Sequence, residues 1–183
     1  VDEMRQVLDL NGIYESITQG GNLEADLNNQ GKAAEEVKVR PDPKPSDSLG
    51  IRNNNPTNLK KGEDWAGLDN SKNDTDFDNF KSPVYGLRAG LKNIKTKFNR
   101  GVNTPRKLIE IWAPISENKH QESYINNLAK ALGVGPDDKI SADKKTMITI
   151  LKAMIIQENG SQYKDYYTDE EIEEAYTLSL KNL

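Results

Sequence analysis

The sequence lacks cysteine throughout its 183 residues and contains one histidine, His120. The absence of cysteine excludes disulfide bonds, thiolate zinc sites and a thiol nucleophile. His120 lies beside Lys119 in a predicted loop, which argues against a role in a catalytic triad or a metal site. Asp137 and Asp138 follow Pro136 in a turn-like pattern without the alternating oxygen ligands of a calcium loop. We therefore predict no metal site and no cofactor.

Long apolar runs are also missing, and none approaches the roughly 20 residues that a membrane-spanning helix requires. The N-terminus has neither the basic nor the apolar segment of a signal peptide. The 25 Lys and Arg residues are outnumbered by 29 Asp and Glu residues, which gives a net charge of -4. Because no basic run stands out, non-specific binding to nucleic acid is not expected. The sequence predicts neither a membrane span nor a nucleic-acid partner.

The chain is polar for a globular protein, since 34% of its residues are hydrophobic and 30% are charged. Part of it is therefore predicted to lie outside the core. Apolar spacing favours a short helix in residues 2–10, whereas residues 20–48 have few large apolar side chains and end in the linker-like RPDPKPSDS. We place the boundary near residue 48, with an N-terminal tether over 1–48 and a folded domain over 49–183.

The folded domain is predicted to be mainly α, with a small β region near its start. The Asn-rich stretch GIRNNNPTNLKKGEDWAGLD, residues 50–69, favours short strands and tight turns. Helices are predicted from apolar spacing, from proline at the first helical position and from glycine after the last one. They are expected to begin at Ser82, Thr104 and Gln121, after Ser141, and at Thr168, which has capping-box spacing with Glu171.

The helix predicted after Ser141 contains a carboxylate, Glu158, that suggests chemistry. Glu158 continues an apolar stripe spaced by four, three and four residues, so it is expected on the core-facing side. The other members of this stripe are Met147, Leu151 and Met154. Burial and the negative end of the helix dipole both predict a raised pKa, which would suit a general acid. The alternative is a glutamate at the edge of the core with its carboxyl group in water.

Five motifs of the folded domain form a recognisable set. They are GIRNNNPTNLKKGEDWAGLD (50–69), FDNFKSPVYGLRAG (77–90), IWAPISEN followed by Tyr124 and Ile125, LGVGPDDKI (132–140) and AMIIQENG (153–160). Together they resemble a group of phage virion proteins that are peptidoglycan hydrolases of the lysozyme-like or lytic transglycosylase type. The resemblance covers nearly all of residues 49–178. The chain departs from the pattern at Thr57, where glycine is usual, and at Asn159, where lytic transglycosylases commonly have serine.

The resemblance implies a lysozyme-like fold that cleaves the glycan strand of peptidoglycan, with Glu158 as acid and base. In lysozyme-like enzymes the acid glutamate ends a core helix, and the chain then enters a β region that forms one wall of the sugar cleft. Here the Asn-rich segment comes first and the glutamate helix last. A circular permutation would account for this order, because domain termini often lie close together. We expect Glu158 and residues 51–69 to face each other across one cleft.

The chemistry that the resemblance implies needs a proton on the leaving glycosidic oxygen, and a second group then determines the product. A lysozyme uses an activated water or a carboxylate nucleophile, whereas a transglycosylase uses a hydroxyl group of the substrate. Four acids in or after the β region are available as partners: Asp64, Asp69, Asp74 and Asp76. The resemblance singles out none of them, so we favour chemistry with a single carboxyl group and leave both outcomes open.

Six further residues are predicted to contact the sugar chain: Asn53, Asn54, Asn55, Asn58, Trp65 and Tyr124. Asparagine amides donate and accept hydrogen bonds, which suits N-acetyl and hydroxyl groups. The alternative is turn chemistry, because asparagine tolerates a left-handed backbone and bonds its own main chain. Trp65 either stacks on a sugar face or fills the core. Tyr124 either points its hydroxyl group toward Glu158 or lies in the core.

The expected setting is the phage particle, with the enzyme acting on the host cell wall or periplasm. Residues 1–48 would dock the folded domain to other virion proteins. The main alternative is a non-enzymatic structural or ejection protein of the virion that keeps the fold and binds glycan. A weaker alternative is a cytoplasmic interaction module.

Overall fold

The computed structural model describes residues 40–72 and 76–183, and this part of the chain is mainly helical, as predicted. The helix expected in residues 2–10 lies outside the described residues. The elements are α3 (Leu49–Arg52), α4 (Pro83–Asn99), α5 (Pro105–Trp112), α6 (Gln121–Leu132), α7 (Lys144–Asn159), the 3-10 helix η2 (Ser161–Tyr163) and α8 (Asp169–Ser179). Not one of these helices has both the length and the apolar character needed to cross a membrane.

The helix ends follow the signals in the sequence. Ser82 and Thr104 precede the prolines that begin α4 and α5, and the Thr104 side chain accepts a hydrogen bond from the backbone of α5. Gly133 ends α6 in the left-handed conformation. Thr168 and Glu171 form both bonds of a capping box at the start of α8. These predictions are confirmed because each depends on a few neighbouring residues.

The predicted β region is wrong in its detail. It begins with a helical turn, α3, and its described residues contribute two isolated antiparallel bridges, Lys60 with Phe77 and Leu68 with Phe80. The rest consists of turns, with left-handed backbone at Asn54 (φ 51°) and Asn58 (φ 50°). Asparagine side chains satisfy the main chain here, so the segment needs no strand ladder.

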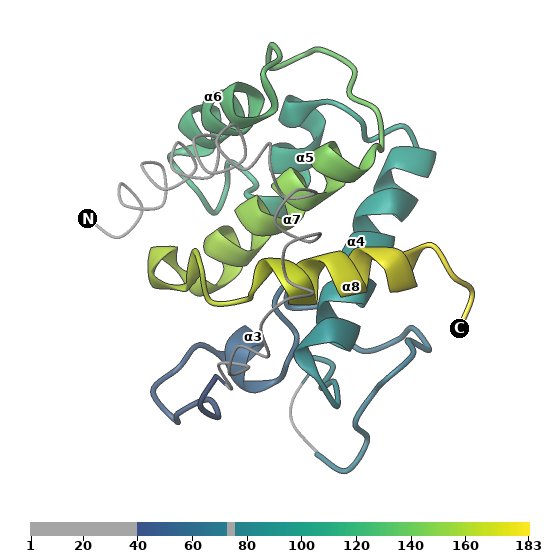
Figure 1. Ribbon diagram of the computed structural model, residues 1–183. Helices are drawn as coiled ribbons and strands as arrows, with labels where there is room; N and C mark the ends of the chain where they lie inside the picture. Colours follow the sequence, from purple (N-terminus) through teal and green to yellow (C-terminus); the bar gives the residue numbers. More distant parts are fainter. Residues whose placement is uncertain (1–39, 73–75) are drawn as a thin grey trace, which may run out of the picture.

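Helix α7 lies at the centre of the molecule, and α8 crosses in front of α4 on its way to the C-terminus (Figure 1). Helix α7 is the element around which the others are arranged. It packs against α3, α4, α6 and α8, and α5 packs against α6. Buried side chains therefore occur on all its sides, namely Met147, Thr149, Ile150, Leu151, Ala153, Met154, Ile155, Ile156 and Asn159. A helix buried almost all round has no single core-facing stripe. Spacing alone thus cannot show which residue of its last turn points inward.

The Asn-rich loop packs closely against α4 at two glycines that are one helical turn apart. A Cβ atom on Gly86 would collide with the carbonyl oxygen of Asn54, and one on Gly90 would lie 2.9 Å from Cγ2 of Thr57. Residues four apart share one face of a helix, so Gly86 gives room to the loop backbone at Asn54, and Gly90 gives room to the Thr57 side chain. This contact places the loop beside the end of α7.

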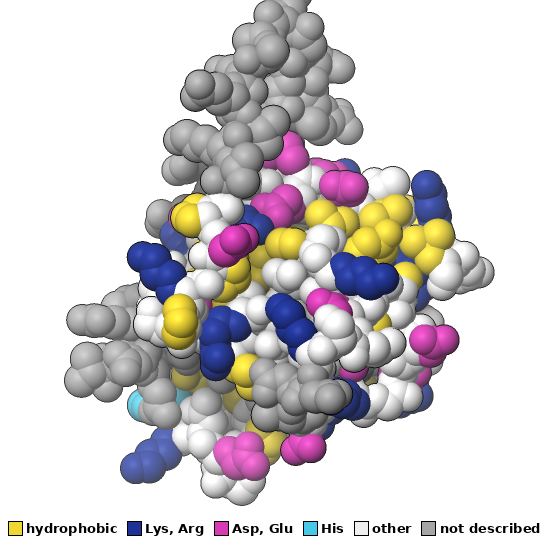
Figure 2. Space-filling model, turned by 90° about the horizontal axis from the view of Figure 1, so that it is seen from below, with side chains coloured by type: hydrophobic (Ala, Val, Ile, Leu, Met, Phe, Trp, Pro, Cys, Tyr) yellow, Lys and Arg dark blue, Asp and Glu magenta, His cyan; other side chains and the backbone are white. Residues whose placement is uncertain are grey.

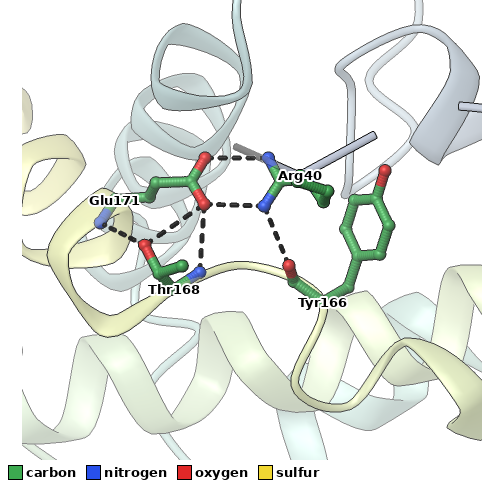
Figure 3. A network of polar contacts seen from close by, with 4 residues as sticks. All are labelled: Arg40, Tyr166, Thr168 and Glu171. Atoms are coloured by element: carbon green, nitrogen blue, oxygen red, sulfur yellow. Dashed lines mark hydrogen bonds and ion pairs between the residues drawn. The ribbon is translucent and has the colours of Figure 1, made fainter. Parts of the chain in front are cut away.

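Arg40, which the sequence assigned to the tether, contacts the helical domain at the start of α8 (Figure 3). Arg40 donates to both carboxylate oxygens of Glu171, at 2.7 and 2.9 Å, and to the carbonyl oxygen of Tyr166 at 2.8 Å. Its guanidinium group also lies 4.5 Å from the centre of the Tyr166 ring. Burial alone would raise the pKa of Glu171, but the hydrogen bonds from Arg40 hold it below its ordinary value. Arg40 therefore fastens this part of the tether to the start of α8.

The last residues of the predicted tether are bound near the end of α7. The hydroxyl group of Tyr163 donates to Asp47 at 2.8 Å and accepts from the Ser48 backbone at 3.1 Å. The Ser48 hydroxyl group donates to Oδ1 of Asn159 at 2.7 Å. Asp47 and Ser48, beside the boundary predicted near residue 48, thus contact the helical domain.

We expect Gly86→Ala to lower the free energy of unfolding by about 1–2 kcal/mol, because overpacking of this close contact with the loop costs about 2–3 kcal/mol. This cost would exceed the gain in helix propensity, about 1 kcal/mol for glycine to alanine. Urea denaturation measures the change, with the exposed Lys95→Ala in α4 as a control. An unchanged stability of Gly86→Ala would contradict the close contact.

Arg40→Met should lower the free energy of unfolding by about 1–3 kcal/mol, because Glu171 loses a charged hydrogen-bond partner in a partly buried position. Substitution of the exposed Arg100 by methionine serves as the control and should change little. Urea denaturation of the full chain distinguishes the two variants. Equal stability of Arg40→Met and the wild type would show that the segment does not dock as described.

Candidate functional site

The candidate site is formed where the last turn of α7 meets the Asn-rich loop. Glu158 lies in that turn with an exposed side chain, and Nδ2 of Asn58 donates a hydrogen bond to its Oε2 at 3.1 Å. These two residues are 100 positions apart in the sequence. The fold therefore joins the two regions that the sequence analysis expected to face each other.

Glu158 itself does not point into the core, which corrects the prediction from the apolar stripe. Leu151 and Met154 are buried as expected, but the inward polar residue at the helix end is Asn159, which is 8% exposed. The physical reason is that α7 is buried on most sides and emerges from the core in its last turn. The alternative of a glutamate at the edge of the core is the one observed.

The pKa of Glu158 is raised, as predicted, because surrounding protein desolvates its carboxyl group. The hydrogen bond from Asn58 acts in the opposite direction by favouring the charged form. Solvent reaches the side chain, yet enough protein surrounds the carboxyl group to disfavour its charge. A group in this position can exchange a proton with a ligand that approaches from solvent.

Asn159 connects three parts of the structure around this carboxyl group. Its Nδ2 donates to the carbonyl oxygens of Pro56, at 2.7 Å, and Ile155, at 3.0 Å. Its Oδ1 accepts from the Ser48 hydroxyl group at 2.7 Å. In the sequence, Asn159 stands out only as a departure from a pattern with serine. An amide offers two donors and an acceptor, so it can make connections that a hydroxyl group at this position could not.

Gly50 is a second residue that the sequence analysis missed. A Cβ atom here would lie 2.5 Å from Oδ1 of Asn159, and 2.8 Å from both the Asn55 carbonyl oxygen and Oδ1 of Asn58. The absence of a side chain in α3 therefore lets the two amides and the loop pack together. The signal was available as a glycine at the start of a motif, but only the tertiary contacts reveal its purpose.

Asn53 and Asn55 hold the loop rather than present amides to a ligand, which corrects their prediction. Asn55 is 0% exposed; its Nδ2 donates to the carbonyl oxygens of Leu59 and Asp78, each at 2.9 Å. Asn53 is 4% exposed, and its carbonyl oxygen accepts from the Phe80 backbone. The alternative of turn chemistry describes Asn55, whereas Nδ2 of Asn53 is buried without a hydrogen-bond partner in the described part of the chain. Asn54 is partly exposed, and its amide donates to the carbonyl oxygen of Phe80 at 3.1 Å.

The two aromatic residues predicted to bind sugar lie in different environments. Tyr124 is 1% exposed and belongs to the hydrophobic core, so it offers almost no surface to a ligand and its prediction is corrected. Trp65 is partly exposed. Its indole Nε1 is buried and has no hydrogen-bond partner among the residues that the structure describes. Trp65 therefore remains a candidate for contact with a ligand, together with Asn54 and Asn58.

The acids considered as partners of Glu158 lie in different environments. Asp64 and Asp76 are exposed, while Asp74 lies outside the described residues. Asp69 accepts hydrogen bonds from Ser71, which lower its pKa. The buried acid of this region is Asp78, which sequence reasoning missed because no pattern separates it from its exposed neighbours. Burial raises the pKa of Asp78, and the nearby charge of Lys61 opposes that shift.

The lower face of the molecule has no single dominant charge. Figure 2, which views the structure from below Figure 1, shows basic and acidic side chains separated by uncharged surface and apolar patches.

Fold and site together define a mainly helical protein in which an accessible glutamate at the end of the central helix is bonded to an Asn-rich loop. The chain belongs to the family of protein P5 of Pseudoalteromonas phage PM2. The two are 37% identical over 132 residues, which cover 69% of this chain and 79% of the relative. No protein-family model matches the chain. The relative is a phage protein whose name specifies no activity.

Glu158→Gln should make the protein more stable than the wild type near neutral pH. The pKa of Glu158 is raised in the fold, so its stabilising contribution is complete below the unfolded pKa, about 4.3. That contribution is lost as the pH rises through the folded pKa, because ionisation is disfavoured in the fold. Glutamine stays neutral and keeps an oxygen for Asn58.

Urea denaturation between about pH 4 and about pH 8 measures this difference, which should grow with pH. The exposed Glu63→Gln is the matched control and should show no comparable trend. A stability difference that is independent of pH would contradict the raised pKa.

Proposed function

We propose that this protein cleaves the glycan strand of bacterial peptidoglycan as a lytic transglycosylase or muramidase, with Glu158 as acid and base. The observation that supports it most directly is the Glu158 carboxyl group itself. It is accessible at the end of the central helix, its pKa is raised by burial, and Asn58 holds one of its oxygens. Glycosidic cleavage needs such a group to protonate the leaving oxygen.

The proposed reaction has two proton transfers by the same carboxyl group. Glu158 first gives its proton to the glycosidic oxygen as the bond from that oxygen to the anomeric carbon breaks. The ionised carboxylate then takes a proton from the hydroxyl group that bonds to the anomeric carbon. In a transglycosylase this hydroxyl group belongs to the substrate, and in a muramidase it belongs to water. A raised pKa supports the first transfer because more of the carboxyl group is protonated near neutral pH.

Within the described part of the chain, the hydrogen-bond partner of the Glu158 carboxyl group is Asn58 and not one of the candidate acids. Asp64 and Asp76 are exposed, and Asp69 is bonded to Ser71 in its own turn. We therefore favour attack by the substrate's own hydroxyl group, which needs no second carboxylate. Mass spectrometry of the released fragments distinguishes an anhydro sugar from a reducing sugar.

A permuted lysozyme-like arrangement accounts for the order of the two site regions. The Asn-rich loop precedes the glutamate helix in the sequence, yet Asn58 bonds Glu158 and Asn159 bonds the carbonyl oxygen of Pro56. In this proposal the loop forms one wall of the sugar-binding cleft. Of the loop residues predicted to contact sugar, Asn54, Asn58 and Trp65 retain exposed surface.

Membership in the family of a phage protein supports a place in the virion. In that setting the particle would carry the enzyme to the host cell wall. The docking role proposed for residues 1–48 then falls mainly on residues 1–39, which lie outside the described residues, because Arg40, Asp47 and Ser48 contact the helical domain.

A second candidate is a non-enzymatic structural or ejection protein of the virion that binds glycan. Asn159, at a position where lytic transglycosylases commonly have serine, favours this candidate. The two candidates share the fold and the glycan surface, so only turnover separates them.

Glu158→Gln should abolish degradation of purified cell walls in a zymogram, with a loss of about 100-fold or more, because glutamine cannot deliver a proton. Circular dichroism should show an unchanged fold, and Glu63→Gln should keep wild-type activity. Retained lysis by Glu158→Gln would reject the assignment of the acid. A wild-type protein that binds cell walls without degrading them would favour the non-enzymatic candidate.

A further inference from the structure

We propose that Asn58 is a positioning residue that holds Oε2 of Glu158 and leaves Oε1 as the oxygen that gives and takes the proton. This inference rests on the proposed function and assigns each carboxyl oxygen a separate part in it. It also replaces the expectation that Asn58 acts only through contact with sugar.

The hydrogen bond from Asn58 engages one oxygen of the carboxyl group. Nδ2 donates to Oε2 at 3.1 Å, and an ionised carboxylate can only accept. When Glu158 is protonated on Oε1, its Oε2 remains an acceptor, so this hydrogen bond is possible in both protonation states. The mobile proton and the bond to the ligand are thereby assigned to Oε1.

The amide oxygen of Asn58, Oδ1, packs against helix α3 without a hydrogen bond from the described part of the chain. It is buried and lies against Gly50. The same glycine also contacts Oδ1 of Asn159, which links α7 to the loop. The Asn58 side chain is thus enclosed between α3 and the end of α7, which restricts its rotation.

The backbone of Asn58 is equally constrained. Its φ of 50° lies in the left-handed region, which asparagine tolerates better than most residues. Its backbone N–H group donates to the Asn55 carbonyl oxygen at 3.0 Å, and the loop is packed on Gly86 and Gly90 of α4. A short side chain on a fixed backbone suits the positioning of a neighbouring carboxyl group.

Two variants separate positioning from general support of the fold. Asn58→Gly retains the left-handed backbone and removes the amide, while Asn58→Asp keeps the shape and removes the donor. Both should raise the pKa of Glu158, with the larger rise in Asn58→Asp because of the added negative charge. An NMR titration of the Glu158 carboxyl carbon in the free, full-length protein measures this change.

Asn54→Gly is the matched control for the NMR measurement. Asn54 has the same left-handed backbone, with φ of 51°, but its amide donates to the carbonyl oxygen of Phe80. We therefore expect the pKa of Glu158 to stay unchanged in this variant. A similar rise in Asn54→Gly would mean that loop disturbance, rather than the lost hydrogen bond, moves the pKa.

The kinetic arm measures wall degradation against pH. In Asn58→Gly, kcat should fall by about 10- to 100-fold with little change in KM, because the reacting oxygen is less well oriented. The alkaline limb of the kcat/KM profile should move to higher pH, because a raised pKa keeps Glu158 protonated up to a higher pH. A purely structural role would lower activity without moving this limb.

The outcomes distinguish the inference from the function on which it rests. If the wild type does not degrade cell walls, the proposed function fails, and the assignment of the reacting oxygen fails with it. An active wild type, together with an unchanged Glu158 pKa and an unmoved alkaline limb in both Asn58 variants, would overturn the role of Asn58 alone. If Asn58→Gly does not fold, Asn58→Asp decides by the same two measurements.

Discussion

The site depends on the buried amide of Asn159. This side chain bonds the carbonyl oxygen of Pro56 in the Asn-rich loop, the carbonyl oxygen of Ile155 within α7, and the hydroxyl group of Ser48 in the N-terminal segment. A buried amide without these partners would be strongly unfavourable, so the three parts are stable only together. Glu158 is adjacent in sequence, and the same interactions that satisfy Asn159 bring its carboxyl group to Asn58.

Three glycines are as important for the position of the loop as the hydrogen bonds are. Gly86 gives room to the loop backbone at Asn54, and Gly90 gives room to the Thr57 side chain. Gly50 gives room to the amides of Asn58 and Asn159. Close packing leaves few voids in protein interiors, so even one methyl group at these positions would displace a neighbour. The loop has little regular secondary structure, and its position is set by these contacts.

The resulting carboxyl group combines two properties that usually oppose each other. Full burial would raise its pKa further but would keep ligands away, whereas full hydration would leave an ordinary carboxylate. At the end of α7 the side chain stays accessible while nearby protein desolvates the charged form. The hydrogen bond from Asn58 moderates that shift, so the loop influences both the orientation and the protonation of Glu158.

The sequence by itself determined the helices from α4 to α8 and their ends, because prolines, caps and apolar spacing act over a few residues. It also identified Glu158 and the Asn-rich loop as partners through a resemblance. Only the tertiary structure decided that Glu158 is exposed, that Asn159 faces inward, and that Asn53, Asn55 and Tyr124 are buried. The physical reason for α7 is that apolar periodicity identifies inward-facing residues only when a helix has one buried face, and α7 is surrounded on most sides. The loop is held by amide hydrogen bonds between residues far apart in the sequence, which local patterns do not reveal.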